Sequence, residues 1–231
     1  MQAEATPDKI LNEEIEAQIN YVLERCNTRL KLIGILDGSD ETSVYGASEN
    51  MRSFLNEFAA ATDKLDIVIL EKGVDRELEA HIGVFAYPIV ALMKPNEGSS
   101  GYSYSGISYY GVPGGHELES FILSIYNVAG PGQPINQDIE ERIMKLETPL
   151  SMKMCVSLSC LMCSELVQAG NRIAALNPGI TAEMIDLSCF ESIHDEFNIV
   201  SVPATIINGK DIVYGRKLLK DMITFLEERI R

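Results

Sequence analysis

The sequence has no long hydrophobic run. No stretch of about 18 apolar residues occurs among its 231 residues, so we expect no transmembrane helix. The first residues, Met1-Gln2-Ala3-Glu4-Ala5, contain neither the basic region nor the apolar region of a secretion signal. These two absences predict a protein of the cytoplasm that has no membrane partner.

Basic residues are scarce. Nineteen Lys and Arg stand against 34 Asp and Glu, and the net charge of −15 disfavours nucleic acids and anionic membranes as partners. The charge is uneven, because residues 1–130 carry 9 basic and 20 acidic residues while residues 131–231 carry 10 and 14. The acidity either keeps the protein in solution or selects a partner, and the sequence leaves both possibilities open.

Cysteine is limited to five residues, and only Cys160 and Cys163 form a close pair. An odd number with a single close pair argues against a disulfide-stapled secreted scaffold. A structural zinc site normally needs four ligands, and Cys155, Cys189 and His194 supply no second pair of the usual spacing. We therefore expect no bound metal, with a metal-holding pair and an inert buried pair as the alternatives.

The order of segments around the pair points to redox chemistry. A short apolar segment at 152–156 precedes it, and a helical pattern follows until Asn177-Pro178-Gly179. This places Cys160 at a helix N-terminus, where unpaired N–H groups and the helix dipole favour a thiolate. Cys163 lies one turn further on and can close a disulfide, as in redox motifs.

Helix and strand patterns recur twice along the chain. In the first set, helices are predicted over 7–26, 44–62 and 116–127, and strands over 30–36, 65–70, 89–93 and 101–106. In the second, helices are predicted over 136–146, 163–176, 190–197 and 218–226, and strands over 152–156, 180–186, 202–207 and 211–214. Asn208-Gly209 is a strong type I′ hairpin signal. Gly130-Pro131-Gly132-Gln133-Pro134 has the composition of a linker, so we predict two repeats, residues 1–130 and 131–231.

Each repeat has one proline where its third strand begins, Pro88 and Pro203. A trans proline at a strand start is the ordinary arrangement. With the Cys-x-x-Cys pair in the same repeat, we predict a cis bond before Pro203. Such a loop would bring the backbone of Val202 beside the dithiol, where it could pair with a substrate strand.

The order strand, Cys-x-x-Cys, helix, strand, helix, X-Pro, hairpin, helix resembles a thioredoxin or glutaredoxin fold. A closer resemblance is to the N-terminal domain of the flavoprotein subunit of alkyl hydroperoxide reductase. It is carried by Val156-Ser157-Leu158-Ser159-Cys160-Leu161-Met162-Cys163, Leu176-Asn177-Pro178, Val202-Pro203-Ala204 and Ile207-Asn208-Gly209-Lys210. That family has two thioredoxin-like folds in tandem, the first without its cysteines. Here Leu36-Asp37-Gly38-Ser39-Asp40 occupies the place of the first pair and contains no cysteine.

The resemblance implies an α/β fold of two tandem thioredoxin-like units, the first lacking the Cys pair. Gly114-Gly115-His116-Glu117-Leu118 looks like the family's Gly-His-Glu segment. By this resemblance Glu117 would approach the dithiol from the other repeat and modulate its pKa. The alternative is a surface glutamate that the helix dipole stabilises. The resemblance also implies a peroxiredoxin as the recipient of electrons and a flavoprotein reductase as their donor.

Three departures from the family pattern matter. Leu161-Met162 replaces the family's His-Asn between the cysteines. The family's reduction potential therefore cannot be assumed for this pair, and the two apolar side chains favour an apolar docking surface. The 231 residues contain no G-x-G-x-x-G unit, so we expect no bound cofactor in this chain. Electrons would come from a separate or missing FAD/NAD(P)H module, and the sequence is either an isolated piece or a stand-alone protein. Residues 101–111 form a longer tyrosine-rich stretch, whose tyrosines are expected to pack.

The leading hypothesis is a dithiol–disulfide oxidoreductase that acts on a peroxiredoxin or another disulfide protein. Cys160 attacks the partner disulfide, Cys163 resolves the mixed disulfide, and Cys189 is a core thiol. The alternatives are a general disulfide oxidoreductase or isomerase and a non-catalytic scaffold with a vestigial dithiol. The predicted catalytic residues are Cys160, Cys163, Pro203 and Glu117, and the predicted substrate-binding residues are Val202, Leu161 and Met162.

Overall fold

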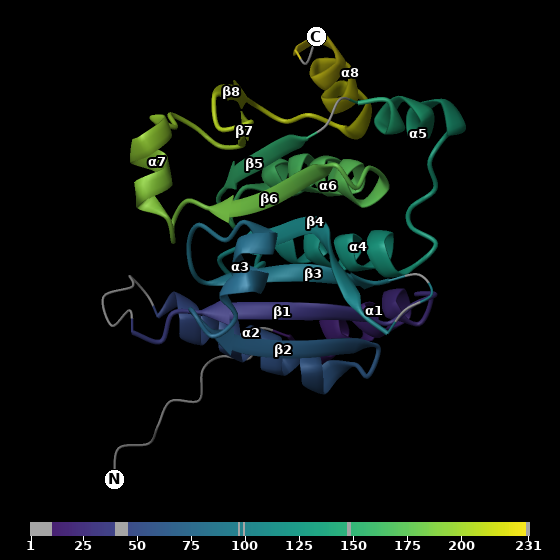
Figure 1. The fold of residues 1–231 in the computed structure, drawn as a ribbon, viewed down its shortest axis with the longest axis vertical. Helices are drawn as coiled ribbons and strands as arrows, with labels where there is room; N and C mark the ends of the chain where they lie inside the picture. Colours follow the sequence, from purple (N-terminus) through teal and green to yellow (C-terminus); the bar gives the residue numbers. More distant parts are fainter. Residues whose placement is uncertain (1–10, 40–45, 97, 99, 147–148, 230–231) are drawn as a thin grey trace.

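The computed structural model describes residues 11–39, 46–96, 98, 100–146 and 149–229. Its centre is one sheet of eight strands in the order β2-β1-β3-β4-β6-β5-β7-β8 (Figure 1). The strands are β1 (Leu30–Leu36), β2 (Leu65–Glu71), β3 (Ile89–Pro95), β4 (Tyr102–Tyr110), β5 (Leu150–Val156), β6 (Ile180–Asp186), β7 (Ala204–Ile207) and β8 (Asp211–Tyr214). The helices are α1 (Glu13–Leu23), α2 (Ala47–Ala61), α3 (Arg76–Ile82), α4 (Glu117–Ala129), α5 (Gln137–Met144), α6 (Leu161–Leu176), α7 (Glu191–Phe197) and α8 (Leu219–Arg229).

The sheet consists of two halves with the same topology. β1 pairs with β2 in parallel and with β3 antiparallel, and β5 pairs in the same way with β6 and β7. The halves join where β4 runs parallel to β6, with Ser108 opposite Glu183. Two tandem thioredoxin-like folds are therefore confirmed, and the cysteine pair lies in the second.

The loops repeat as well as the strands. The peptide bonds before Pro88 and Pro203 are both cis, which confirms the prediction for Pro203 and adds a second one that we did not predict. The N–H of Gly111 donates to the carbonyl of Pro88, and the N–H of Gly215 donates to the carbonyl of Pro203. Both glycines have φ of 90°. The first repeat has thus kept the proline loop of the fold without the dithiol.

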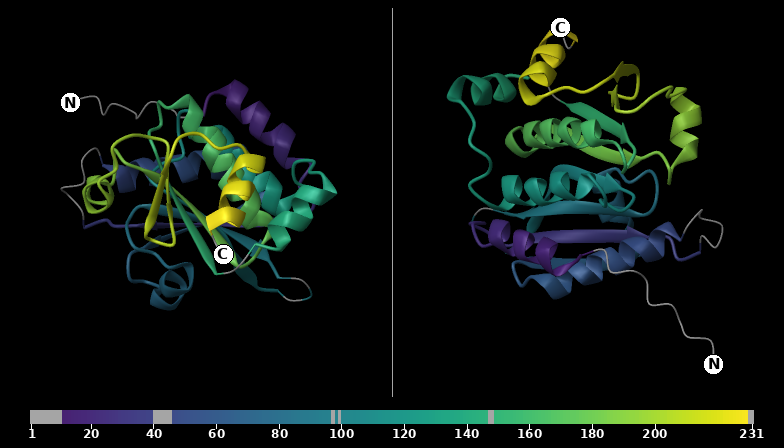
Figure 2. Two further views of the ribbon diagram at one scale, coloured as in Figure 1. Left: turned by 90° about the horizontal axis from the view of Figure 1, so that it is seen from above. Right: turned by 180° about the vertical axis from the view of Figure 1, so that it is seen from behind.

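Helices cover both faces of the sheet (Figure 2). α1, α2, α4 and α6 pack on one face, and the short helices α3 and α7 pack on the other (Figures 1 and 2). The core on each face continues through both repeats: one contains Leu32 and Met154, the other Ile35 and Cys155. Because the repeats share both cores, each supports the other.

The boundary predicted at residue 130 falls between α4 and α5, in a segment without a helix or strand. Because the two repeats share a sheet and two cores, this boundary stays a prediction. None of the helices in the described ranges is long and apolar enough to cross a membrane.

The largest differences between the element predictions and the structure are at α3, α1 and β4, and other bounds shift by about two residues or more. We did not predict α3, because it has only seven residues and only Leu78 and Ile82 among them are large and aliphatic. α1 begins at Glu13, where the Asn12 side chain accepts from the N–H of Ile15 as an N-cap. β4 extends to Tyr110, because Tyr109 and Tyr110 are buried core residues. Residues 7–10, 40 and 44–45, which our predictions also covered, lie outside the described residues.

Candidate active site

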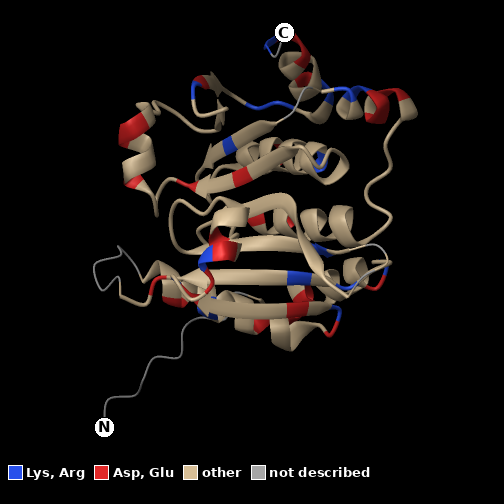
Figure 3. Ribbon diagram, viewed as in Figure 1, with Lys and Arg blue, Asp and Glu red and all other residues tan. Residues whose placement is uncertain are grey.

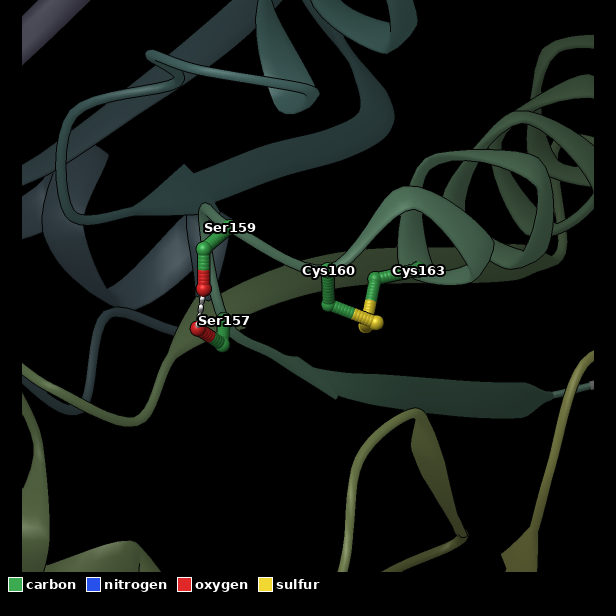
Figure 4. The surroundings of a disulfide bond; sticks show 4 residues. All are labelled: Ser157, Ser159, Cys160 and Cys163. Carbon is green, nitrogen blue, oxygen red and sulfur yellow. Dashed lines mark hydrogen bonds between the residues drawn. A yellow bond between two sulfur atoms is a disulfide. The ribbon is translucent and has the colours of Figure 1, made fainter.

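Cys160 and Cys163 form a disulfide at the start of α6, with their Cα atoms 5.4 Å apart (Figure 4). β5 leads into a short loop in which the hydroxyls of Ser157 and Ser159 are hydrogen-bonded at 3.1 Å. Cys160 is the N-cap residue of α6, so the predicted position at a helix N-terminus is confirmed. In the reduced protein, this terminus would stabilise a Cys160 thiolate.

The two sulfurs differ in their access to solvent. Cys163 is 0% exposed, whereas Cys160 is only partly buried. Between them, Leu161 is 70% exposed and Met162 is 53% exposed. An approaching molecule therefore meets Cys160 and an apolar tip first, and it reaches Cys163 only through the bond to Cys160.

The proline loop lies beside the dithiol loop. β7 runs antiparallel to β5 with Ala204 opposite Cys155, so Val202 and Pro203 lie beside the residues that follow Cys155. Val202 and Cys160 both pack against the same core. Within the described part of the chain, no backbone group bonds the N–H or C=O of Val202. This backbone is free to accept an added strand.

The start of α4 in the first repeat contacts the dithiol loop in the second. The N–H of His116 donates to the carbonyl of Leu158 at 3.1 Å. Glu117, the next residue, is 0% exposed, so the alternative of a surface glutamate is wrong. Among the described residues, no hydrogen bond joins Glu117 to either cysteine, and its effect on the dithiol stays a prediction.

Burial controls the protonation of Glu117. Desolvation by burial raises the pKa of Glu117 to about 7. A hydrogen bond from the Ser120 hydroxyl opposes this shift, and the negative charge of Asp186 adds to it. The Ser120 hydroxyl donates to Oε2 at 2.7 Å, whereas Oε1 has no partner among the described residues. Asp186 is itself buried, where β6 ends beside Val156 of β5. A carboxyl with this pKa is poised to exchange a proton near neutral pH.

A buried hydrogen-bond network extends from Glu117 to the helix that carries the cysteines. The Tyr109 hydroxyl lies 3.3 Å from the Ser120 hydroxyl and 3.0 Å from the Ser124 hydroxyl. The Asn171 amide of α6 donates to Tyr109 at 2.8 Å and to Ser124 at 2.9 Å. These residues were not predicted as site residues. Ser120 and Ser124 interrupt the apolar face of a predicted helix, which is the signal that could have revealed them.

The close approach at Leu158 gives a testable prediction. A Cβ on Gly115, whose φ is +55°, would lie 2.6 Å from the carbonyl oxygen of Leu158. Gly115→Ala should therefore lower the free energy of unfolding by about 2 kcal/mol, measured by urea unfolding of the oxidised protein. Gly114→Ala is the matched control, because its nearest neighbour would be a Val112 methyl group at 3.9 Å. Equal stability of the two variants would contradict a tight junction between α4 and the dithiol loop.

The other three cysteines are free. Burial raises the pKa of Cys155 to about 12, and burial with the charge of Asp186 raises the pKa of Cys189 to about 11. Cys26 is partly buried, and burial raises its pKa as well. These thiols remain protonated at neutral pH, so they are poor nucleophiles. Within the ranges the structure describes, no group of three or more His, Cys, Asp or Glu is arranged to hold a metal ion.

The family model described as thioredoxin domain matches residues 150–227, the second repeat. The alkyl hydroperoxide reductase AhpF of Staphylococcus epidermidis is 31% identical over 217 residues, 94% of this chain. The chain spans 38% of the length of that relative.

Solved structures match along almost the whole chain. A structure of the alkyl hydroperoxide reductase AhpF of Enterococcus faecalis and one of its N-terminal domain are each 32% identical, with TM-scores of 0.85 and 0.84. Each match covers 94% of this chain and 99% of the other. A protein disulfide oxidoreductase from Aeropyrum pernix has a TM-score of 0.80 at 16% identity, so that match shows a shared fold alone.

Proposed function

The chain belongs to the family of the N-terminal domain of the alkyl hydroperoxide reductase AhpF, and from this premise we propose that it carries electrons to the disulfide of a peroxiredoxin. Its chemistry is thiol–disulfide oxidoreduction at Cys160 and Cys163. The electrons come from a flavoprotein module with FAD and NAD(P)H that is separate from these 231 residues. No cofactor takes part in the exchange of sulfur bonds itself.

The cycle consists of two exchanges. A reduced dithiol of the flavoprotein module reduces the Cys160–Cys163 disulfide, and two electrons and two protons pass to this chain. The Cys160 thiolate then attacks one sulfur of the partner disulfide, and the other partner sulfur leaves as a thiol after protonation. The Cys163 sulfur attacks the mixed disulfide at Cys160, which releases the reduced partner and re-forms the intramolecular bond.

One observation carries this proposal: the unequal exposure of the two sulfurs at the N-terminus of α6. A nucleophile must meet a bulky protein disulfide, which the partly exposed Cys160 can do. A resolving thiol must wait until the mixed disulfide has formed, and burial of Cys163 excludes outside disulfides until then. This arrangement favours transfer of electrons over an inert structural bond.

The remaining predicted site residues have roles within this proposal. The free backbone of Val202, beside Pro203, pairs with the partner segment that contains the disulfide. Leu161 and Met162 contact apolar side chains of that segment. Glu117 gives up or takes a proton as the dithiol changes its redox state, which the raised pKa of its buried carboxyl supports. A cytoplasmic location is consistent with the three free cysteines.

The reduction potential tests this function. The full chain is equilibrated in thiol–disulfide buffers, and each cysteine is then read by alkylation and mass spectrometry. We expect Cys160 and Cys163 to change together as a two-electron pair at about −270 mV, as in thioredoxin-like donors of electrons. Cys26, Cys155 and Cys189 should remain reduced throughout and serve as internal controls.

Two outcomes would overturn the proposal. A midpoint near about −180 mV would support the general oxidoreductase or isomerase instead. If Cys160 and Cys163 never oxidise as a pair, the dithiol has no redox role, and the scaffold alternative would stand.

A further inference from the structure

We propose that a pocket on the flank of α6, with the guanidinium of Arg172 in its wall, binds a carboxylate group. The pocket has a volume of about 270 Å³, and its lining residues on α6 run from Glu165 to Arg172. Its floor is one face of α6, and its sides are the segment after α4 and the start of α8. The lining residues are Gln133, Pro134, Glu165, Gln168, Ala169, Arg172, Leu218 and Leu219.

Arg172 is the unusual member of this set. It is only 6% exposed, and a buried arginine is normally paired with a carboxylate. Here the two groups that accept its hydrogen bonds are neutral: Nη1 donates to the Asn127 side-chain oxygen at 3.0 Å, and Nη2 donates to the Gln133 carbonyl at 2.6 Å. Within the described ranges, Nε donates no hydrogen bond. A guanidinium has five N–H donors, so the edge formed by Nε remains available for a carboxylate.

The charges around the pocket support an anionic occupant. Glu165 also lines it, but this carboxylate is engaged by Arg216 in an ion pair. Glu140 acts on Arg172 electrostatically from an exposed position and forms no ion pair with it among the described residues. Lys217 and Lys220 flank the lining residues Leu218 and Leu219. The segment between β8 and α8 carries the two basic residues Arg216 and Lys217 (Figure 3).

Burial without a counter-ion has an energetic consequence. Desolvation by burial lowers the pKa of Arg172, and the negative charge of Glu140 opposes this shift. Its present bonds hold the segment after α4, since the N–H of Gln133 also donates to Asn127. This anchoring role uses two of the five donors of the guanidinium. A bound carboxylate would supply the missing negative charge.

The carboxylate could belong to a free small acid or to an acidic side chain of a bound protein. Arg172 lies nine positions after Cys163 on one helix, which corresponds to about 14 Å along its axis. A protein held at Cys160 could therefore place an acidic side chain in the pocket; only this second source rests on the proposed function. Both sources share the same chemistry, and the experiment separates them.

The test follows the Nε–H signal of Arg172 by NMR in the oxidised, ¹⁵N-labelled full chain. The signal is identified by its loss in Arg172→Lys. Sodium succinate and sodium acetate are titrated against sodium chloride at constant ionic strength. We expect a saturable shift with the two acids, with a Kd on the order of 1–10 mM, and none with chloride. An acetylated and amidated peptide Gly-Ser-Glu-Ser-Gly, compared with its Gln counterpart, tests the protein source.

A second pair of variants tests the site while leaving Arg172 and its hydrogen bonds to Asn127 and Gln133 unchanged. Leu218 is exposed at the pocket mouth, so Leu218→Glu places a competing negative charge there, whereas Leu218→Gln does not. We expect Leu218→Glu to weaken succinate binding at least about tenfold and Leu218→Gln to leave it near the wild-type value. Absence of a saturable shift with succinate, acetate and the Glu peptide would overturn the proposal. Equal binding by the two Leu218 variants would also overturn it.

Discussion

A Cys163→Ser variant should accumulate as a mixed disulfide between Cys160 and its substrate, whereas Cys160→Ser should form no mixed disulfide. The reason is the difference in burial, because Cys163 is fully buried and cannot meet an outside disulfide directly. Removal of the attacking thiolate should lower turnover of a peroxiredoxin disulfide by about 10³-fold or more. Without Cys163, the first exchange still proceeds but the product is not released. Non-reducing gels and intact mass measure the trapped species, and a coupled assay with the reductase module measures turnover.

The control for this experiment is Cys26→Ser, which removes a partly buried free thiol far along the chain from the dithiol. It should keep wild-type turnover and trap nothing. A mixed disulfide on Cys163 in the Cys160→Ser variant would contradict the assigned order of attack. Wild-type turnover by either dithiol variant would show that this pair is not the reacting site.

Local patterns in the sequence were enough to predict most strands. β1 and β6 have the predicted bounds, because each is a short run of mostly buried residues next to polar or turn residues in the sequence. Asn208 and Gly209 both have positive φ, as a type I′ turn requires. These features depend on residues close together in the chain, which a single sequence displays directly.

The parts that were missed depend on distant residues. Tyr109 and Asn171 are 62 positions apart, and their hydrogen bond forms because α6 of the second repeat packs on β4 of the first. Burial of Glu117 has the same origin, since no local pattern distinguishes it from the exposed Glu119 two residues later. Arg172 was also unnoticed, because a single arginine in a helical pattern is ordinarily exposed.

Some features of the candidate site could likewise be predicted from neighbouring residues, and others depend on the folded structure. The position of Cys160 at a helix N-terminus followed from its neighbours in sequence, and the structure confirms it. The role predicted for Pro203 followed from the Cys-x-x-Cys pair in the same repeat, whereas the role predicted for Glu117 came from a family resemblance, because its position beside the dithiol loop requires the folded sheet. Asp186, which acts on Glu117, could have been noticed as an acidic residue that ends a predicted buried strand.

Glu117→Gln should remove a pH dependence from the stability of the oxidised protein. In the unfolded chain this carboxyl has its ordinary pKa of 4.5, and in the folded protein burial raises the pKa to about 7. A raised folded-state pKa gives a contribution that is fully present below pH 4.5 and is lost as the pH rises through about 7. The difference corresponds to about 3 kcal/mol of the free energy of unfolding. Urea unfolding at a series of pH values from 4.5 to 8.5 measures it.

The wild-type free energy of unfolding minus that of Glu117→Gln should fall by about 3 kcal/mol across this range and then level off above pH 8. Taking the difference removes the contributions of other groups, such as Glu183, whose pKa burial also raises. The matched control is Glu119→Gln, an exposed position on the same helix, and its difference from wild type should not change with pH. A wild-type minus Glu117→Gln difference that stays constant would show that Glu117 is ionised in the folded protein at all of these pH values.

The sign of this effect bears on the role of Glu117. At pH 8 the amide variant should be the more stable protein, so the carboxyl lowers stability where an isosteric neutral group would not. A buried acid that destabilises the fold near neutral pH is characteristic of a group retained for proton transfer. If Glu117 serves the dithiol, Glu117→Gln should also change how the reduction potential of Cys160 and Cys163 varies with pH between 6 and 8. A change in stability with an unaltered pH dependence of the potential would assign Glu117 to the junction between the repeats alone.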